Sequence, residues 1–233
     1  EADPTFDIDG IDAAHKLAIL ASVAFGGEVN FDAVHVEGIR HVSPMDMQFA
    51  EELGYRIKLL GIASIRGDGL EQRVHPCMVP LHTPIAHVDG VFNAVVAEGD
   101  FVDQTVYEGR GAGAGPTASA VAADLVDIAR GLNLAPFAVA ASDLQEVPTL
   151  PMDDHEGPVY VRLMVLDQPG VMADVAAILR DENVSIESVL QRGRSPGEVV
   201  PVILILHDAR EGAMKRVLKS LEEMEPVVEP PRM

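Results

Sequence analysis

The chain has 233 residues and is strongly acidic, with 37 aspartates and glutamates against 17 lysines and arginines and a formal net charge of -20. Such a charge repels nucleic acids and anionic membrane surfaces, so neither is expected as a partner. Apolar residues make up 48% of the chain, enough for the core of one large or two small soluble domains. The single cysteine, Cys77, cannot form an internal disulfide, and no apolar run reaches the roughly 18 residues of a membrane span. These features favour a cytoplasmic protein.

Short segments with the composition of strands, separated by Gly, Asp and Pro, dominate the first 140 residues. We expect strands over 55–65, 72–81, 101–107 and 135–140. Helices are predicted over 11–25, 44–53 and 115–131. Apolar residues occupy nearly every helical position of the first helix, which is therefore expected to be buried. Ser43 and Pro44 have the preferred composition of an N-cap and a first helical position. The pattern predicts an α+β fold, a mixed β-sheet with helices on one face.

The segment 146–157 contains prolines and acidic residues without periodicity, and we interpret it as a linker between two domains, 1–145 and 158–233. The second domain has its own order of elements. Strands are predicted over 159–166, 184–190, 199–206 and 226–228, and helices over 171–179 and 214–221. This βαββαβ order is the ferredoxin-like pattern.

Asp12 and Lys16 are four residues apart in the first predicted helix, so their side chains share one helical face. That face continues with Ile19, Leu20 and Val23, which predicts a lysine at the mouth of an apolar region. Burial of a lysine beside a carboxylate is costly, and such a lysine is a functional candidate. A surface salt bridge at a helix start, next to acids favoured by the helix dipole, explains the same spacing. Spacing alone favours the salt bridge.

The run Glu1-Ala-Asp-Pro-Thr-Phe-Asp-Ile-Asp-Gly, continued through Lys16 to Ala21, resembles the signature of homoserine dehydrogenases. The resemblance implies that Glu1 and Asp12 bind the amino acid substrate, that Asp7 is an acid of the same pocket, and that Lys16 is catalytic. It implies interconversion of L-homoserine and L-aspartate 4-semialdehyde with NADP or NAD. A carboxylate can hold the substrate ammonium, and Lys16 can act as general acid in reduction and, when neutral, as base in oxidation.

The sequence begins at Glu1, not Met, and its start lacks the positive charge and apolar run of a secretory signal. We therefore interpret it as a fragment. The resemblance implies that the nucleotide-binding domain, with another active-site lysine and the residues that distinguish NAD from NADP, lies outside it. We expect no turnover from this part alone.

A glycine-rich segment, Gly109-Arg-Gly-Ala-Gly-Ala-Gly115, follows a predicted strand and precedes a helix. Its first six residues satisfy G-x-G-x-x-A, a dinucleotide-binding pattern. A complete Rossmann domain does not fit, because the linker follows at once. The resemblance implies that Gly111 and Gly113 approach the bound nicotinamide, which small residues permit. A tight turn without a ligand is the alternative.

The run Asp167-Gln-Pro-Gly-Val-Met-Ala-Asp, followed later by Asn183-Val-Ser-Ile, resembles an ACT domain from about Pro158 to the C-terminus. ACT domains pair side by side, so the resemblance implies a homo-oligomer, at least a dimer, that also pairs through the catalytic sheet. It implies feedback inhibition by threonine, with Gly170 and Asn183 at the effector. Ordinary turn chemistry explains Asn183 equally well.

Two other functions fit parts of the same pattern. A non-enzymatic amino-acid-binding dimerisation module would need the N-terminal acids only for structure. A different NAD-dependent amino acid oxidoreductase could share the catalytic fold. The eight histidines form no metal-ligand spacing, so we expect no metal site.

Overall fold

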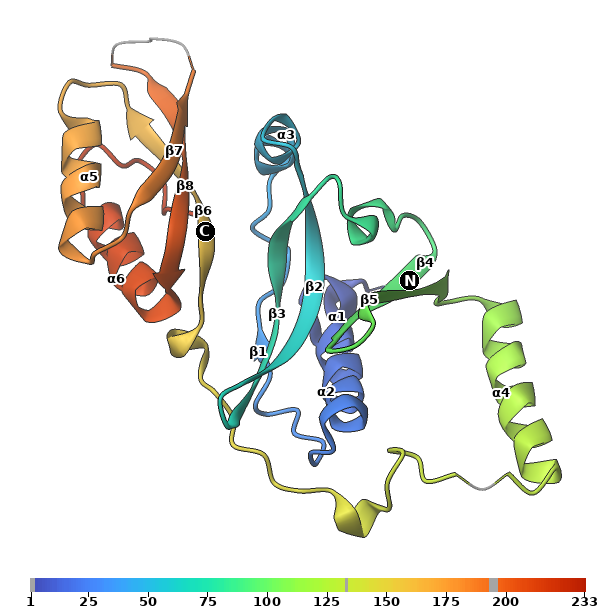
Figure 1. The fold of residues 1–233 in the computed structure, drawn as a ribbon. Coiled ribbons are helices and arrows are strands. Elements are labelled where there is room, and N and C mark those ends of the chain that lie inside the picture. The colour runs from blue at the N-terminus through green and yellow to red at the C-terminus, as the bar shows by residue number, and fades with distance from the viewer. Residues whose placement is uncertain (1–2, 133, 193–196) are drawn as a thin grey trace.

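The computed structural model describes residues 3–132, 134–192 and 197–233. The chain folds into two units joined by an extended segment (Figure 1). The first unit contains α1 (Thr5–Ile8), α2 (Ile11–Phe25), β1 (His35–Val36), α3 (Pro44–Glu52), β2 (Tyr55–Arg66), β3 (Gly69–Pro80), η1 (Pro84–His87), β4 (Phe92–Gly99), β5 (Asp103–Arg110) and α4 (Ala114–Ala129). The short helices η2 (Ala141–Asp143) and η3 (Met152–Asp154) precede the second unit, which contains β6 (Glu156–Leu166), α5 (Val171–Asp181), β7 (Ile186–Gln191), β8 (Val199–Arg210) and α6 (Glu211–Glu222). The predicted α+β class is confirmed.

The first unit has a mixed sheet in the order β1-β3-β2, as expected, with β1 parallel and β2 antiparallel to β3. The strands β4 and β5 form a separate two-stranded sheet, so the single sheet predicted for this unit is divided. The predicted strand 135–140 is wrong. Ala138 has a φ of +63° and donates a backbone hydrogen bond to Ala135, a turn conformation that an extended strand excludes.

Helix α2 has the predicted bounds and packs on one face of the sheet through small and aliphatic residues. Its buried contacts come from Ala14, Leu17 and Ala18, which meet Val74 of β3. Three further apolar groups, Ile19, Leu20 and Val23, are exposed. The predicted burial of the whole helix is therefore wrong, because the described residues cover only one of its faces.

The start of α3 is fixed by a capping box, as Ser43 and Pro44 predict. The amide of Asp46 donates to Ser43 Oγ over 3.2 Å, and the amide of Ser43 donates to Asp46 Oδ2 over 2.9 Å. Both groups are left without helical partners at an N-terminus, so the reciprocal pair satisfies them locally. The carboxylate of Asp46 thereby takes a defined direction.

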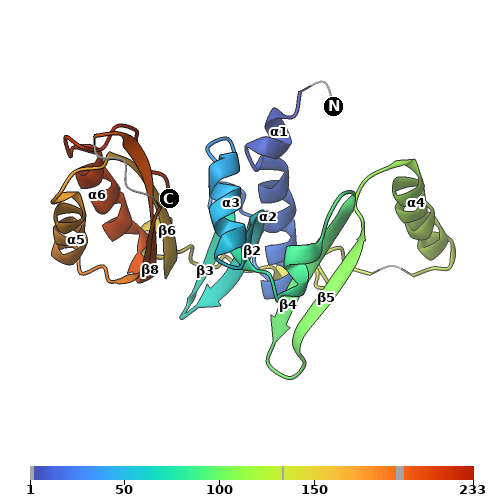
Figure 2. The same ribbon diagram turned by 90° about the horizontal axis from the view of Figure 1, so that it is seen from above.

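The β4–β5 hairpin and α4 expose many large apolar side chains. Helix α4, all of whose residues the structure describes, buries none of them, and both views show it apart from the rest of the first unit (Figures 1 and 2). The exposed apolar set on these elements includes Phe92, Val95, Val106, Tyr107, Val121, Leu125, Val126 and Ile128. So many exposed large apolar side chains are unusual for surfaces that face only water.

The second unit is a three-stranded antiparallel sheet in the order β6-β8-β7, with α5 and α6 packed on one face. Its residues alternate: Val161, Leu163 and Val165 of β6 are fully buried beneath the helices. The predicted last strand, 226–228, is reduced to one isolated bridge, Val165–Val227, and a second bridge, Arg162–Arg232, follows it. Prolines at 226, 230 and 231 lack the N–H groups that a longer ladder needs.

The predicted linker is an ordered segment along the first unit. Gln145 bridges to Gly27 and Thr149 to Leu70, and the amide of Leu70 donates to the carbonyl of Pro148 over 2.7 Å. These contacts hold the segment against the start of β3. Among the described residues, no helix combines the length and apolar character that crossing a bilayer requires.

Candidate functional site

The N-terminal segment is held in place by the loop that follows β1. The guanidinium of Arg40 pairs with the carboxylate of Asp9 through two hydrogen bonds, which lower the pKa of that carboxyl below its usual value. The amide of Ile39 donates to the carbonyl of Ile8 over 2.9 Å. A β-carbon on Gly38 would collide with that same carbonyl. Sequence reasoning missed this anchor, because no local pattern links Arg40 to Asp9.

Asp12 and Lys16 form an ion pair in the first turns of α2, with Lys16 Nζ 2.5 Å from Asp12 Oδ2. The side chains are 66% and 37% exposed, respectively, so the expected burial of Lys16 is wrong in this chain. Asp7 is also exposed, on α1. Glu1 lies outside the described residues. The pair is thus open to a ligand or to a further part of the protein.

Three aromatic rings form a stack that includes His15, the residue before Lys16. His15 lies between Phe6 and Phe31, with ring centroids 5.9 and 4.1 Å apart and nearly parallel planes. The stack joins α1 and the segment after α2 to the residue next to Lys16, and it contributes to their relative position. Only the adjacency of His15 to Lys16 could have indicated it in the sequence.

The glycine-rich segment forms the turn between β5 and α4, as predicted. A β-carbon on Gly111 would collide with the side chain of Asn93 on β4, and Gly113 has a φ of +117°, which side chains rarely adopt. Gly113 is the N-cap of α4, and the whole turn is exposed. The backbone at this helix start can therefore be approached closely by a flat or polar group.

Two half-buried side chains on β3, His75 and Cys77, belong to the opposite face of the sheet from α2. Burial and the charge of Arg73 lower the pKa of His75 to about 4. Burial raises the pKa of the Cys77 thiol to about 11. Near neutral pH the imidazole is uncharged and the thiol protonated, so neither group has the properties of a catalytic nucleophile or of a histidine base tuned near neutrality.

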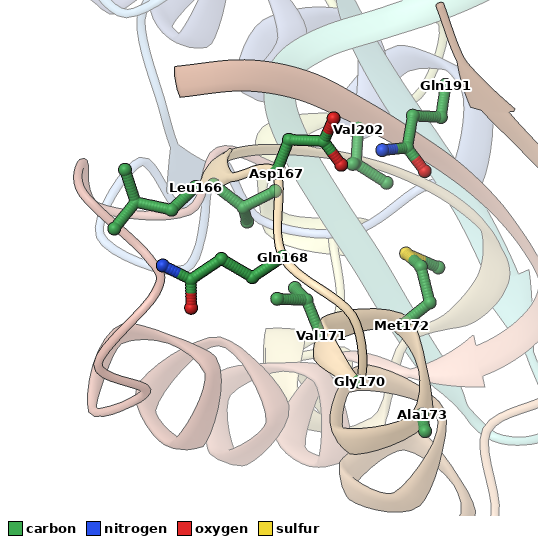
Figure 3. A pocket seen from close by; sticks show the side chains of 10 residues that line it. Leu166, Asp167, Gln168, Gly170, Val171, Met172, Ala173, Gln191 and Val202 are labelled. Atoms are coloured by element: carbon green, nitrogen blue, oxygen red, sulfur yellow. The ribbon is translucent and has the colours of Figure 1, made fainter. Parts of the chain in front are cut away.

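A cavity of about 210 Å³ lies in the second unit at the start of α5 (Figure 3). Its volume is below the roughly 300 to 1,000 Å³ of pockets for drug-sized ligands, which suits a smaller molecule. It is lined by Val165, Leu166, Asp167, Gln168, Gly170, Val171, Met172, Ala173, Gln191 and Val202. A second and larger cavity, of about 440 Å³, is lined by residues 32–36 and 149–152. Neither includes Lys16 or Gly111, so the single polar cavity expected around them is not confirmed.

Gly170 lies in the cavity, whereas Asn183 does not line it. Gly170 is the N-cap of α5 and has a φ of +100°, while Asn183 follows the other end of the helix with a φ of +57°. An eleven-residue helix separates them by about 16 Å. Gln168 and Gln191 are polar lining residues that the sequence analysis missed. Gln168 is in the same turn as Gly170, but Gln191 is brought there only by pairing of β7 with Val202 on β8.

Both units of the chain are similar to known protein families. A family model described as "Homoserine dehydrogenase" matches residues 1–126, and one described as "ACT domain" matches 159–223. Homoserine dehydrogenases of Pseudomonas aeruginosa and Neisseria gonorrhoeae are 45% and 43% identical to this chain over 99% of its length, and it covers 55% and 54% of theirs. The crystal structure of a homoserine dehydrogenase from Thiobacillus denitrificans aligns with all of this chain and 54% of its own, with 44% identity and a TM-score of 0.91.

The chain thus spans about half the length of the curated relatives it matches. The family model covers more than half of this chain and includes α2, the mixed sheet and the glycine turn. The structural match extends over both units. On these grounds the chain belongs to the homoserine dehydrogenase family, with an ACT domain at its C-terminal end.

Proposed function

We propose that the protein to which this chain contributes interconverts L-homoserine and L-aspartate 4-semialdehyde with NAD or NADP. The observation that carries the proposal is the accessible Asp12–Lys16 pair on α2, within the segment matched by the family model. Lys16 has an accessible ammonium that can give a proton to the carbonyl oxygen of the semialdehyde and, when neutral, take it from the hydroxyl. Asp12, Asp7 and Glu1 supply carboxylates for the substrate ammonium.

The glycine turn fits contact with the nicotinamide end of the cofactor. The cofactor supplies or accepts the hydride at the substrate carbon. Gly111 is packed against Asn93 and Gly113 has a left-handed φ, so the turn presents backbone instead of side chains to an approaching ring. The adenosine and phosphates need a nucleotide-binding domain beyond the described residues, and we expect this chain alone to be inactive.

Substitution of Lys16 in the complete parent protein tests the activity. Lys16→Ala should reduce turnover with homoserine by about 100-fold or more, since a positioned general acid–base contributes about 10² to 10⁴. Cofactor affinity, measured by fluorescence titration, should be unchanged. Lys219→Ala provides the matched control, because Lys219 is an exposed lysine on α6. Turnover retained in Lys16→Ala would refute the assigned role, and no turnover of homoserine by the wild type would refute the reaction.

The ACT cavity is the site that we assign to an amino acid effector, threonine. Its polar groups, Gln168, Gln191 and Asp167, together with the amides at the start of α5, can bind the charged and hydroxyl groups of an amino acid. Calorimetry of this chain with L-threonine should give saturable heat that Gln191→Leu weakens. A wild-type titration without heat would exclude threonine as the effector.

A homo-oligomer, at least a dimer, accounts for the exposed apolar surface of the first unit. The exposed side chains of β4, β5 and α4 are numerous enough for a protein interface. Light scattering coupled to size exclusion should give at least twice the chain mass of 24.9 kDa. A monomer at micromolar concentration would contradict this assembly for the chain.

A further inference from the structure

One face of α3 is turned toward the ACT domain. Asp46, Phe49 and Glu52 follow each other at three-residue spacing, which places them on the same side of the helix. Asp46 accepts hydrogen bonds from β6. Phe49 and Glu52 both contact Arg192, which directly follows β7. The helix therefore meets two different strands of the ACT sheet.

The carboxylate of Asp46 divides its hydrogen bonds between the two units. Its Oδ2 accepts from the amide and hydroxyl of Ser43 over 2.9 and 2.6 Å, while its Oδ1 accepts from Tyr160 Oη and Arg162 Nε over 2.8 and 2.7 Å. Asp46 is only 4% exposed. Burial alone would raise its pKa, but the hydrogen bonds from Ser43, Arg162 and Tyr160 outweigh burial and hold the pKa below its usual value. Two of these four hydrogen bonds to the buried charge come from the ACT domain.

Arg192 provides the second contact. Its guanidinium pairs with Glu52, and its central carbon lies 6.0 Å from the centroid of the Phe49 ring, at the outer limit of a cation–π contact. Gln191, the preceding residue, lines the ACT cavity. A shift of Gln191 toward a ligand therefore acts directly on the residue that contacts α3.

The cavity and the Asp46 contact also share β6. Val165 and the two residues after it line the cavity, and Arg162 is three residues earlier on the same strand. From Val159 to Leu166 the ladder between β6 and β8 is uninterrupted. A paired strand transmits displacement along its length better than a loop does, so the cavity end of β6 is mechanically linked to Asp46.

On its other side, α3 is connected to the helix that carries the catalytic candidates. It leads through a short turn into β2 and packs against it. Gly61 of β2 lies against Leu17 of α2, with 3.5 Å between the Leu17 side chain and the position of a β-carbon on Gly61. Leu17 is adjacent to Lys16. The order of contacts is therefore ACT cavity, β6 and β7, α3, β2 and α2.

We propose that the face of α3 formed by Asp46, Phe49 and Glu52 is the interface through which an amino acid in the ACT cavity acts on α2. This inference rests on the proposed function for the ligand and for the role of α2, but its contacts stand independently of both. Directional hydrogen bonds and a buried charge favour one register of the two units over others. The interface can therefore respond to a small change of the ACT sheet.

Hydrogen exchange of the 233-residue chain, resolved by mass spectrometry, tests the proposal with L-threonine as the probe. Arg192→Gln removes the contacts to Glu52 and Phe49, and Tyr160→Phe removes one donor to Asp46 while keeping the ring. Arg180→Gln is the matched control, because Arg180 is an exposed arginine of the ACT domain that pairs with its neighbour Asp181.

Without ligand, the amides of α3 should exchange about three- to tenfold faster in both interface variants and at the wild-type rate in the control. With saturating threonine, the wild type and the control should show a change of exchange in α3 and α2 that Arg192→Gln lacks, although its threonine affinity is within about threefold of wild type. Unchanged α3 exchange in both interface variants, or a full threonine response in Arg192→Gln, would overturn the proposal.

Calorimetry tests threonine as the effector, and hydrogen exchange tests the proposed interface, so the two inferences can fail separately. If calorimetry shows no threonine binding to the wild type, threonine is the wrong effector. The exchange rates without ligand then still show whether the ACT contacts hold α3. If threonine binds but α3 and α2 exchange as before, the effector is right and the interface does not transmit its binding.

Discussion

The ACT domain and the first unit, which we name the catalytic unit after its proposed role, bury their apolar residues to very different extents. Among the described residues, the ACT domain has a core of fifteen buried side chains, whereas the largest cluster in the longer catalytic unit has five. In α4 no residue is buried. The smaller unit therefore completes its own core, while the larger unit leaves much of its apolar surface for other chain segments or subunits to cover.

The two units also differ in how enclosed their candidate sites are. The cavity of the ACT domain is formed within one chain by β6, α5, β7 and β8. The catalytic candidates Asp12 and Lys16 lie on an accessible surface instead, and the glycine turn is exposed as well. Under the proposed function, effector binding can thus be examined in this chain alone, whereas the proposed catalysis is expected only of the complete protein.

The largest difference is expected between a Leu→Ala substitution in the ACT domain and one in α4. Leu163 of β6 is 0% exposed and Leu125 of α4 is 62% exposed. Leu163→Ala should lower the free energy of unfolding by about 2 to 5 kcal/mol, because it leaves a cavity in a closed core. Leu125→Ala should change it by less than about 0.5 kcal/mol. Urea unfolding followed by circular dichroism measures both.

The small effect expected for Leu125→Ala tests whether α4 is exposed in solution. Should Leu125→Ala destabilise the chain as much as Leu163→Ala does, the outer face of α4 is covered in solution. Repeating the measurement over a range of protein concentrations then identifies a second copy as the cover, since stability from association increases with concentration.

Acid should weaken the catalytic unit before the ACT domain. Burial and the charge of Arg73 lower the pKa of His75 to about 4, whereas an unfolded histidine titrates near 6.5. Between these values the unfolded chain binds a proton that the folded chain does not. Stability is therefore complete above about pH 6.5 and decreases as the pH falls toward 4, by up to about 3 kcal/mol.

Exchange of β3 amides at pH 7 and pH 5 measures this effect, with β8 amides as the internal reference. His75→Gln should remove most of the difference between the two pH values for β3. His207→Gln is the control, because His207 is an exposed histidine on β8. Equal acid sensitivity of β3 in wild type and His75→Gln would show that other groups determine it.

Sequence reasoning predicted the elements whose signals are local. The bounds of α2, the Ser43 cap of α3 and the alternation in β6 follow from side-chain periodicity and capping chemistry. The separate β4–β5 sheet and the missing strand at 135–140 could not be predicted in this way. Strand pairing is decided by contacts between distant segments, and a composition typical of strands does not reveal the positive φ of Ala138.

In the candidate site, too, local relations were predicted from the sequence and contacts between distant segments were not. The spacing of Asp12 and Lys16 predicted that they share a helical face, and they do form a pair. Their exposure was predicted wrongly, because apolar neighbours on a helix do not reveal whether anything covers them. The partners of Asp46 on β6 are more than a hundred residues away, and Gln191 reaches the ACT cavity only through strand register. No local pattern contains such information.

The smallest effects are expected at Gly170 and Asn183, two residues of the ACT domain with a positive φ. Gly170→Ala should cost about 1 to 2 kcal/mol, because its φ of +100° disfavours any side chain, and it should weaken threonine binding at the cavity. Asn183→Gly should change stability by less than about 0.5 kcal/mol, since glycine adopts a φ near +57° readily, and should leave the threonine heat unchanged in calorimetry. Loss of that heat in Asn183→Gly would mean that Asn183 contacts the ligand after all. Because the two residues lie at opposite ends of α5, such contact requires the ACT domain of a second copy to complete the cavity.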